Sequence, residues 1–174
     1  HDSERISGLL EADGLIPAVS EEEADVIVLN TCCIRENADN RLYGALGNLK
    51  TLKAERPNVQ IAVGGCLAQK DRELIQQRAK HVDVVFGTHN VQNAVKLLKE
   101  SETQGPIIEI LEELVEEDHE AFPSALPVRR EVDHRAWITL QIGCDNTCTY
   151  CIVPSVRGPE ISRPFGQLLD EARN

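Results

Sequence analysis

Three short apolar runs, each followed by a segment with helical spacing, constrain the fold of this 174-residue chain more than any other feature. The runs cover Asp25 to Leu29, Val59 to Val63 and Val82 to Phe86. Between the first two runs, apolar side chains recur every three or four residues from Ile34 to Leu52 and form one helix face. An alternation of strands and helices is typical of a parallel sheet with helices packed on it. The sequence therefore predicts a doubly wound α/β domain over residues 1–100.

Helical spacing occurs in three further segments. It predicts helices from Leu67 to Ala79 and from Val91 to Leu98, and a first helix around Ile6. Because strands and helices alternate in such a domain, the first helix needs a partner strand, which we expect upstream of His1.

The regular alternation ends near residue 100. Residues 101–120 carry eight acidic and no basic side chains, and prolines follow at positions 123 and 127, so we expect residues 101–135 to form a linker. From Ala136 to Ile142 apolar and polar residues alternate as in a strand, and helical spacing resumes at about Phe165. Residues 136–174 are therefore predicted to begin a second α/β unit.

The net charge of −11 argues against a chain that binds nucleic acid by itself, because such proteins usually present a basic face. Most of this charge is local, since the net charge without residues 101–120 is only −3. No apolar run approaches the roughly 18 residues that a membrane-spanning helix needs. We therefore expect no membrane partner.

Three of the six cysteines crowd into one short segment. Cys144, Cys148 and Cys151 follow the spacing CxxxCxxC directly after the predicted strand. Thiolates are the usual ligands of iron–sulfur clusters, and three thiolates leave one iron of a four-iron cluster open to another ligand. The alternative, a structural zinc loop, needs a fourth ligand at short spacing, and the neighbouring sequence offers none. The spacing therefore favours a cluster that takes part in catalysis.

Two further cysteines, Cys32 and Cys66, each follow a predicted strand. Parallel strands end at the same sheet edge and lie about 4.8 Å apart, so these two thiols are expected to converge on one metal centre. A third ligand would follow the strand that we expect upstream of His1. His89 lies at the same edge and is an alternative ligand, although a polar residue at a helix start is the simpler interpretation. Cys33 is expected to be a small, buried side chain without a ligand role.

Several stretches of the sequence match those of a known family. They are Asn30-Thr31-Cys32-Cys33-Ile34-Arg35-Glu36, Gly64-Gly65-Cys66-Leu67-Ala68-Gln69, the CxxxCxxC loop, Arg157-Gly158 and Ser162-Arg163-Pro164. Together they resemble the radical S-adenosylmethionine methylthiotransferase family. The resemblance implies two 4Fe–4S clusters, one on Cys144, Cys148 and Cys151, the other on Cys32, Cys66 and a cysteine upstream of His1. It also implies that residues 136–174 begin a radical S-adenosylmethionine partial α/β barrel.

The resemblance assigns further residues to the cofactor. Tyr150, the aromatic residue before the last cysteine of the loop, would lie near the adenine of S-adenosylmethionine. Arg157 and Arg163 are candidates for binding a phosphate or a cofactor carboxylate, because the guanidinium fork suits both groups.

By the same resemblance, the protein is a transferase that converts N6-dimethylallyladenosine at position 37 of tRNA to its 2-methylthio derivative. The versions NTC-x-IRE and GGCLAQ favour this substrate over threonylcarbamoyl-adenosine in tRNA or a ribosomal protein, which other members modify. The implied partners are tRNA and an electron donor such as flavodoxin or ferredoxin, and the expected location is cytoplasmic. Because the barrel of this family would extend beyond Asn174, residues 1–174 alone are expected to be inactive.

An alternative from another class is a non-catalytic iron–sulfur protein that only transfers electrons. Such a protein of the ferredoxin type would show the run CxxCxxC with a further cysteine before a proline. The sequence has neither feature, so the transferase is the better interpretation.

Overall fold

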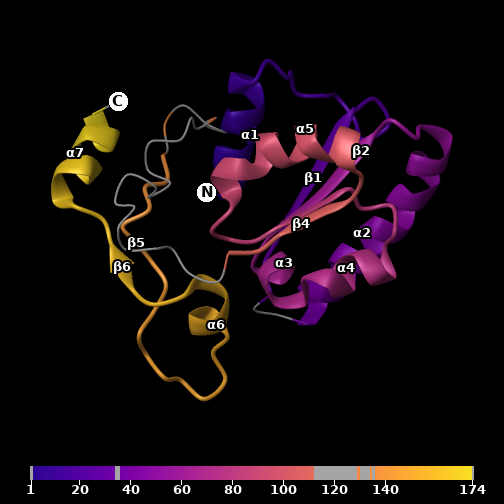
Figure 1. Ribbon diagram of the computed structural model, residues 1–174. Coiled ribbons are helices and arrows are strands. Elements are labelled where there is room, and N and C mark those ends of the chain that lie inside the picture. Colours follow the sequence, from indigo (N-terminus) through magenta and orange to yellow (C-terminus); the bar gives the residue numbers. More distant parts are fainter. Residues whose placement is uncertain (1, 34–35, 112–128, 130–133, 135, 174) are drawn as a thin grey trace.

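The computed structural model describes residues 2–33, 36–111, 129, 134 and 136–173 (Figure 1). Within them, four parallel strands form one sheet in the order β1-β2-β3-β4. The strands are β1 (Val26–Thr31), β2 (Gln60–Gly65), β3 (Val84–Phe86) and β4 (Ile107–Glu109). The first three lie where the apolar runs predicted them.

Helices cover both faces of this sheet. Helices α1 (Asp2–Ala12) and α5 (Ala94–Gln104) lie on one face, and α2 (Glu36–Glu55), α3 (Cys66–Asp71) and α4 (Glu73–Arg78) lie on the other (Figure 1). A single turn of 3-10 helix, η1 (Val91–Asn93), precedes α5. The predicted α/β fold with a helix-covered parallel sheet is confirmed.

The strands are buried on both faces because their side chains alternate between two apolar clusters. Ile61 and Val63 of β2 pack against the face covered by α2, α3 and α4, whereas Ala62 packs against the face covered by α1 and α5. All three are fully buried. Complete burial of a valine or isoleucine side chain contributes about 1.5–3 kcal/mol relative to exposure, so β2 is the centre of the fold.

Two predicted boundaries differ from the structure. The helix predicted from Leu67 to Ala79 is divided into α3 and α4 at Arg72, whose φ of 47° lies in the left-handed region and ends α3. The linker predicted from residue 101 begins later, because α5 continues to Gln104 and β4 then pairs with β3. A strand of three residues is too short to produce a detectable periodicity. Residues 112–128 of the predicted linker lie outside the described residues.

The C-terminal part contains a small antiparallel sheet and two helices. Strand β5 (Gln141–Ile142) pairs with β6 (Ile161–Ser162), and the helices are α6 (Val153–Arg157) and α7 (Phe165–Arg173). The strand predicted from Ala136 to Ile142 is therefore limited to its last two residues, whereas α7 begins where it was predicted. That this part begins a barrel stays a prediction.

Helix α6, which the sequence did not predict, packs on the larger sheet unit. Val156 is buried in the same apolar cluster as β2 and α3. The Thr88 hydroxyl, beyond the end of β3, donates a hydrogen bond of 2.6 Å to the Val156 carbonyl. The C-terminal part is thus attached at the carboxyl edge of the parallel sheet.

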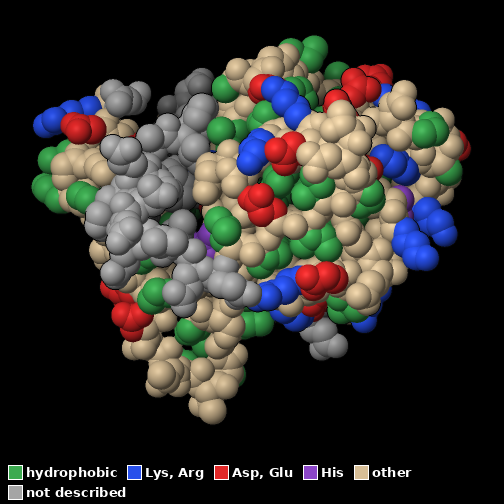
Figure 2. Space-filling view, in the orientation of Figure 1, with side chains coloured by type: hydrophobic (Ala, Val, Ile, Leu, Met, Phe, Trp, Pro, Cys, Tyr) green, Lys and Arg blue, Asp and Glu red, His purple; other side chains and the backbone are tan. Residues whose placement is uncertain are grey.

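Acidic and basic side chains are intermixed over the visible face of the sheet unit (Figure 2). In the part of the chain that the structure describes, no helix is both long and apolar enough to cross a membrane.

Candidate functional site

The CxxxCxxC segment is a closed loop between β5 and α6. Gly143 begins it with a φ of 76°, and a Cβ atom on this residue would lie 1.8 Å from the Pro159 carbonyl oxygen. The backbones are this close because the Cys144 N–H donates to the Gly158 carbonyl at 3.2 Å. Only glycine combines this φ with so close an approach, so the residue before the first cysteine fixes where the loop starts.

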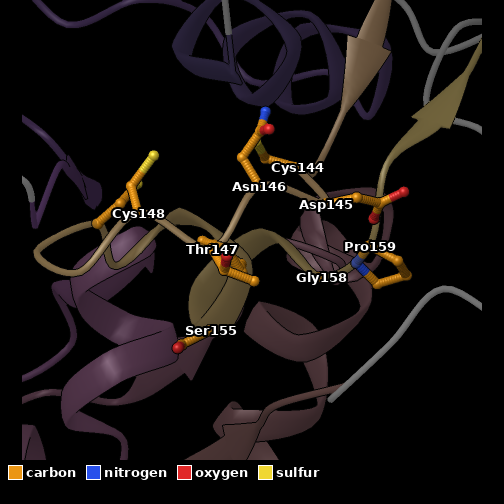
Figure 3. A pocket seen from close by; sticks show the side chains of 10 residues that line it. Cys144, Asp145, Asn146, Thr147, Cys148, Ser155, Gly158 and Pro159 are labelled. Carbon is orange, nitrogen blue, oxygen red and sulfur yellow. The ribbon is translucent and has the colours of Figure 1, made fainter.

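All three cysteines of this loop line one pocket of about 620 Å³. Cys148 is exposed and Cys144 and Cys151 are partly buried, and all three are free thiols. Figure 3 shows Cys148 on the opposite side of this pocket from Asp145, Gly158 and Pro159, with Ser155 of α6 below the loop. We call this the loop pocket.

The donors in the loop pocket fit a cluster held by three thiolates. Thiolate sulfur is the ligand that iron–sulfur clusters take, and all three cysteines line this pocket. Across the described residues, however, no three Cys, His, Asp or Glu side chains are close enough to form a metal-binding group. Binding a cluster would therefore require the loop to draw its thiols closer together.

A second pocket, of about 520 Å³, lies at the carboxyl edge of the parallel sheet, and we call it the edge pocket. Thr31 and Gly65 are paired at the ends of β1 and β2, so the cysteines that follow them are neighbours. Cys32 and Cys66 both line the edge pocket, as their positions after two strands predicted. His89 is buried at 3% exposure and does not line this pocket.

Cys33 also reaches the edge pocket but differs from its neighbours. It is 8% exposed, as predicted for a small core residue. Burial raises the pKa of its thiol to about 11, with smaller contributions from the nearby Cys66 and Cys32. A thiol must lose its proton to bind a metal, so this environment disfavours Cys33 as a ligand.

Arg157 connects the C-terminal part to the edge pocket. Its Nε donates to Cys66 Sγ at 3.3 Å, and its Nη2 forms an ion pair of 2.7 Å with Asp2 Oδ2. Burial by itself lowers the pKa of Arg157, but the charges of Asp2 and Cys66 and their hydrogen bonds outweigh burial, and the pKa is raised. Arg157 is therefore a fixed cation beside a candidate ligand.

The other two residues assigned to the cofactor lie elsewhere. Arg163 has a side chain only 1% exposed, and its Nη1 is 2.5 Å from Glu171 Oε2 and donates to the Thr139 carbonyl at 3.0 Å. This placement connects β6 to α7 and gives Arg163 a structural role. Tyr150 is 95% exposed. Of Tyr150, Arg157 and Arg163, only Arg157 lines the edge pocket, and none of the three lines the loop pocket.

The residues of the edge pocket that the sequence did not single out include Asp2, Arg5 and Thr88. Asp2 and Arg5 come from α1, whose apolar face was recognised from Ile6 while its polar residues were not considered. Arg5 gave no signal, because a charged residue beside an apolar one is ordinary in an amphipathic helix. Thr88 carried no signal, because its partner Val156 is 68 residues away in sequence.

Comparison with known proteins agrees with this architecture. A family profile described as Uncharacterized protein family UPF0004 matches residues 1–87, which is half of the chain. This match covers α1 and the first three strands, including both Cys32 and Cys66.

Curated relatives resemble nearly the whole chain. A Nocardioides protein is 55% identical over 172 residues, a Streptomyces griseus protein 56% over 174, and a Nocardia farcinica protein 52% over 174. Each comparison covers 98% or 99% of this chain but only 33% or 34% of the relative. All three relatives are named tRNA-2-methylthio-N(6)-dimethylallyladenosine synthase. The chain thus spans about a third of the length of these relatives, and the profile match shows that it belongs to the UPF0004 family.

Proposed function

We propose that this protein acts in the methylthiolation of tRNA, converting N6-dimethylallyladenosine at position 37 to its 2-methylthio derivative. The observation that carries the proposal is the 55% identity over 172 residues to a relative named for this reaction. The arrangement of the cysteines supports it, because two groups of thiols line two separate pockets. Modification of threonylcarbamoyl-adenosine or of a ribosomal protein is the alternative within the family.

In this proposal, Cys144, Cys148 and Cys151 hold one 4Fe–4S cluster in the loop pocket. When bound and reduced, this cluster would supply an electron for the homolytic cleavage of S-adenosylmethionine, and the resulting adenosyl radical would remove a hydrogen atom from the adenine of the tRNA substrate. The protein closes the loop through Gly143, and the three cysteines line the loop pocket. Tyr150, next to Cys151, is exposed and can contact an adenine ring that enters from solvent.

Cys32 and Cys66 hold the second cluster, at the edge pocket, where sulfur is made available for transfer. Arg157 stabilises this site because its guanidinium offsets the negative charge of a thiolate at Cys66, 3.3 Å away. A third ligand completes this site. Arg163 would bind a phosphate or cofactor carboxylate only by giving up hydrogen bonds, because its Nη1 already donates to Glu171 and to the Thr139 carbonyl. Within the cytoplasm, tRNA and a donor such as flavodoxin or ferredoxin are the proposed partners.

The proposal is tested first by cluster binding. The chain is purified without oxygen, reconstituted with iron and sulfide, and compared with a Cys144→Ala, Cys148→Ala, Cys151→Ala variant by iron content and by electron paramagnetic resonance. We expect a reduced-cluster signal that S-adenosylmethionine alters in the wild type and not in the variant. Cys33→Ala is the matched control, since a buried thiol without a ligand role should leave the signal unchanged.

The reaction itself is tested on tRNA. A complete methylthiotransferase gene that includes this sequence is expressed in a host strain whose tRNA carries N6-dimethylallyladenosine but no 2-methylthio group, and tRNA nucleosides are measured by mass spectrometry. We expect the methylthiolated nucleoside to accumulate, and Cys144→Ala to abolish it. Sulfur on threonylcarbamoyl-adenosine or on a ribosomal protein instead would establish one of the alternatives.

A further inference from the structure

A further pocket, of about 730 Å³, lies between α2 and the end of α4, and we call it the helix pocket. Among its lining residues are three cations, Lys50, Arg78 and Lys80, and no carboxylate is among the described residues that line it. The chain as a whole carries a net charge of −11. A local excess of positive charge in such a chain is the type of surface that attracts a polyanion.

Two of the three cations are available to a ligand. Lys50 and Lys80 are exposed, and neither forms an ion pair within the part of the chain that the structure describes. Neighbouring lysines outside the pocket differ in this respect. Lys53, one helical turn after Lys50, pairs with Asp83 at 2.8 Å. The lysines that line the helix pocket are therefore those whose charge the protein does not neutralise.

The third cation and the wall beside it are held in place by the protein. The guanidinium of Arg78 lies 4.9 Å from the centre of the Tyr43 ring, within the range of a cation–π contact. The Tyr43 hydroxyl donates to Asp71 at 2.7 Å, so this nearby carboxylate is already hydrogen bonded. His81 Nε2 donates to the Leu46 carbonyl at 2.7 Å. A ligand would thus meet a wall that needs little further ordering, which favours binding.

The backbone of α2 is open to a ligand at this pocket. Gly47 lines the pocket, and a Cβ atom on this residue would have no other atom within 4 Å. Glycine inside a helix is less stable than alanine, and packing among the described residues does not require it here. The absence of a side chain allows a ligand to approach the helix closely.

The helix pocket lies away from the cysteines. Lys80 and His81 directly precede β3, so the pocket is toward the amino ends of the strands, whereas Cys32 and Cys66 follow their carboxyl ends. Figure 1 shows α2 on the opposite side of the sheet unit from β5, β6 and α7. In Figure 2, Lys and Arg side chains flank a histidine on this side of the molecule. Only a large ligand can contact this pocket and the cysteines together.

We propose that the helix pocket binds the phosphate backbone of RNA through Lys50, Arg78 and Lys80. A lysine binds phosphate as a point charge, and a guanidinium group binds it through two parallel hydrogen bonds. Contacts of this kind position a nucleic acid without reading its sequence. RNA is the polyanion expected here because the proposed function requires tRNA, and the inference rests on the proposed function in this respect. The backbone contact would hold the tRNA while the base to be modified lies at the cysteines.

The site is tested by binding of fluorescently labelled tRNA to the complete protein that includes this sequence. Fluorescence anisotropy gives Kd from about 50 to 200 mM salt for the wild type and for a Lys50→Gln, Lys80→Gln variant. Loss of two phosphate contacts should weaken binding roughly tenfold or more near 0.1 M salt, and should lower the slope of log Kd against log salt by about 1.5–2. Because both lysines are exposed, Tm should stay unchanged, which separates a role in binding from a role in folding.

Lys96→Gln, Lys99→Gln is the matched control. It removes the same charge from α5, on the other face of the sheet, where these lysines already pair with Glu100 at 3.8 Å and with Asp13 at 2.5 Å. We expect its tRNA affinity and salt dependence to equal those of the wild type. An equal loss in both variants would show a general effect of charge and would overturn the proposal.

Two further outcomes would also overturn the proposal. One is unchanged tRNA affinity in the Lys50→Gln, Lys80→Gln variant. The other is binding of polyglutamate, but not of tRNA, that depends on these lysines, which would identify an acidic polypeptide as the partner. The measurement requires no sulfur transfer. Methylthiolation without lysine-dependent binding would therefore refute this site alone, and lysine-dependent binding without methylthiolation would refute the proposed reaction alone.

Discussion

Tyr43 shows how one side chain holds three helices together. It lies in α2, its hydroxyl donates a hydrogen bond of 2.7 Å to Asp71 of α3, and the guanidinium of Arg78 in α4 lies 4.9 Å from its ring centre. Burial, followed by this hydrogen bond and the charge of Asp71, raises the pKa of Tyr43 to about 12. The neutral phenol is therefore the form that the fold stabilises.

Tyr43→Phe tests this contact. Loss of the hydrogen bond to a carboxylate should lower the free energy of unfolding by roughly 1–2 kcal/mol at pH 8, measured by urea denaturation. A raised pKa means that the contribution is complete below the ordinary tyrosine pKa near 10 and is lost as the pH rises toward 12. The difference between wild type and variant should therefore shrink above pH 10. Tyr150→Phe, at a residue 95% exposed, is the control and should change stability little; an equal loss in both variants would refute the role of Asp71.

At the scale of secondary structure, Asp83 connects the end of α2 to the sheet. Just before β3, its carboxylate accepts two hydrogen bonds from Lys53 Nζ, at 2.8 and 2.9 Å, and one from the Ile61 N–H of β2 at 2.8 Å. Both charged side chains are mostly buried, at 20% and 23% exposure. This one residue therefore fixes the spacing between α2 and two neighbouring strands.

Asp83→Ala should lower the free energy of unfolding by roughly 2–4 kcal/mol, because it leaves the partly buried ammonium group of Lys53 without its carboxylate and the Ile61 N–H without its acceptor. The measurement is equilibrium denaturation in urea. Asp170→Ala removes an exposed ion pair of 3.6 Å with Arg173, with side chains 73% and 75% exposed, and should cost less than about 0.5 kcal/mol. Similar losses in the two variants would show that Asp83 does not connect these elements.

The elements that the sequence predicted and missed differ in length and in the range of their contacts. Strand β2 and helix α2 were predicted because the spacing of their own apolar residues indicates which side chains are buried. The three residues of β4 and the five of α6 are too short to show a period. The break between α3 and α4 depends on the left-handed φ of Arg72. An arginine in the sequence does not predict such a φ.

At the scale of the whole molecule, the C-terminal part is held on the sheet unit by a few specific contacts. Thr88, after β3, donates to the Val156 carbonyl at 2.6 Å, and Arg157 reaches both Cys66 and Asp2. Since Thr88 is buried at 6% exposure, its hydrogen bond is protected from water. These contacts fix how the two groups of cysteines are arranged relative to each other.

Thr88→Val should loosen this attachment. The substitution leaves the Val156 carbonyl without its donor at a cost of roughly 1–3 kcal/mol, so amide hydrogens of residues 153–158 should exchange faster while those of β2 are unchanged. Hydrogen exchange followed by mass spectrometry makes the comparison. Thr103→Val removes an exposed hydrogen bond to the Glu100 carbonyl within α5 and should alter neither segment. Unchanged exchange at residues 153–158 in Thr88→Val would show that other contacts hold α6.

The sequence by itself determined the α/β class, the positions of three strands and the assignment of the cysteines to two groups, because periodicity and spacing are local properties of the chain. Only the tertiary structure decided that Arg157 enters the edge pocket and that Arg163 is buried against α7. Arg157 meets Cys66 and Asp2 across 91 and 155 residues of sequence. Such contacts depend on how separate elements pack, and no local pattern specifies which buried charges find partners.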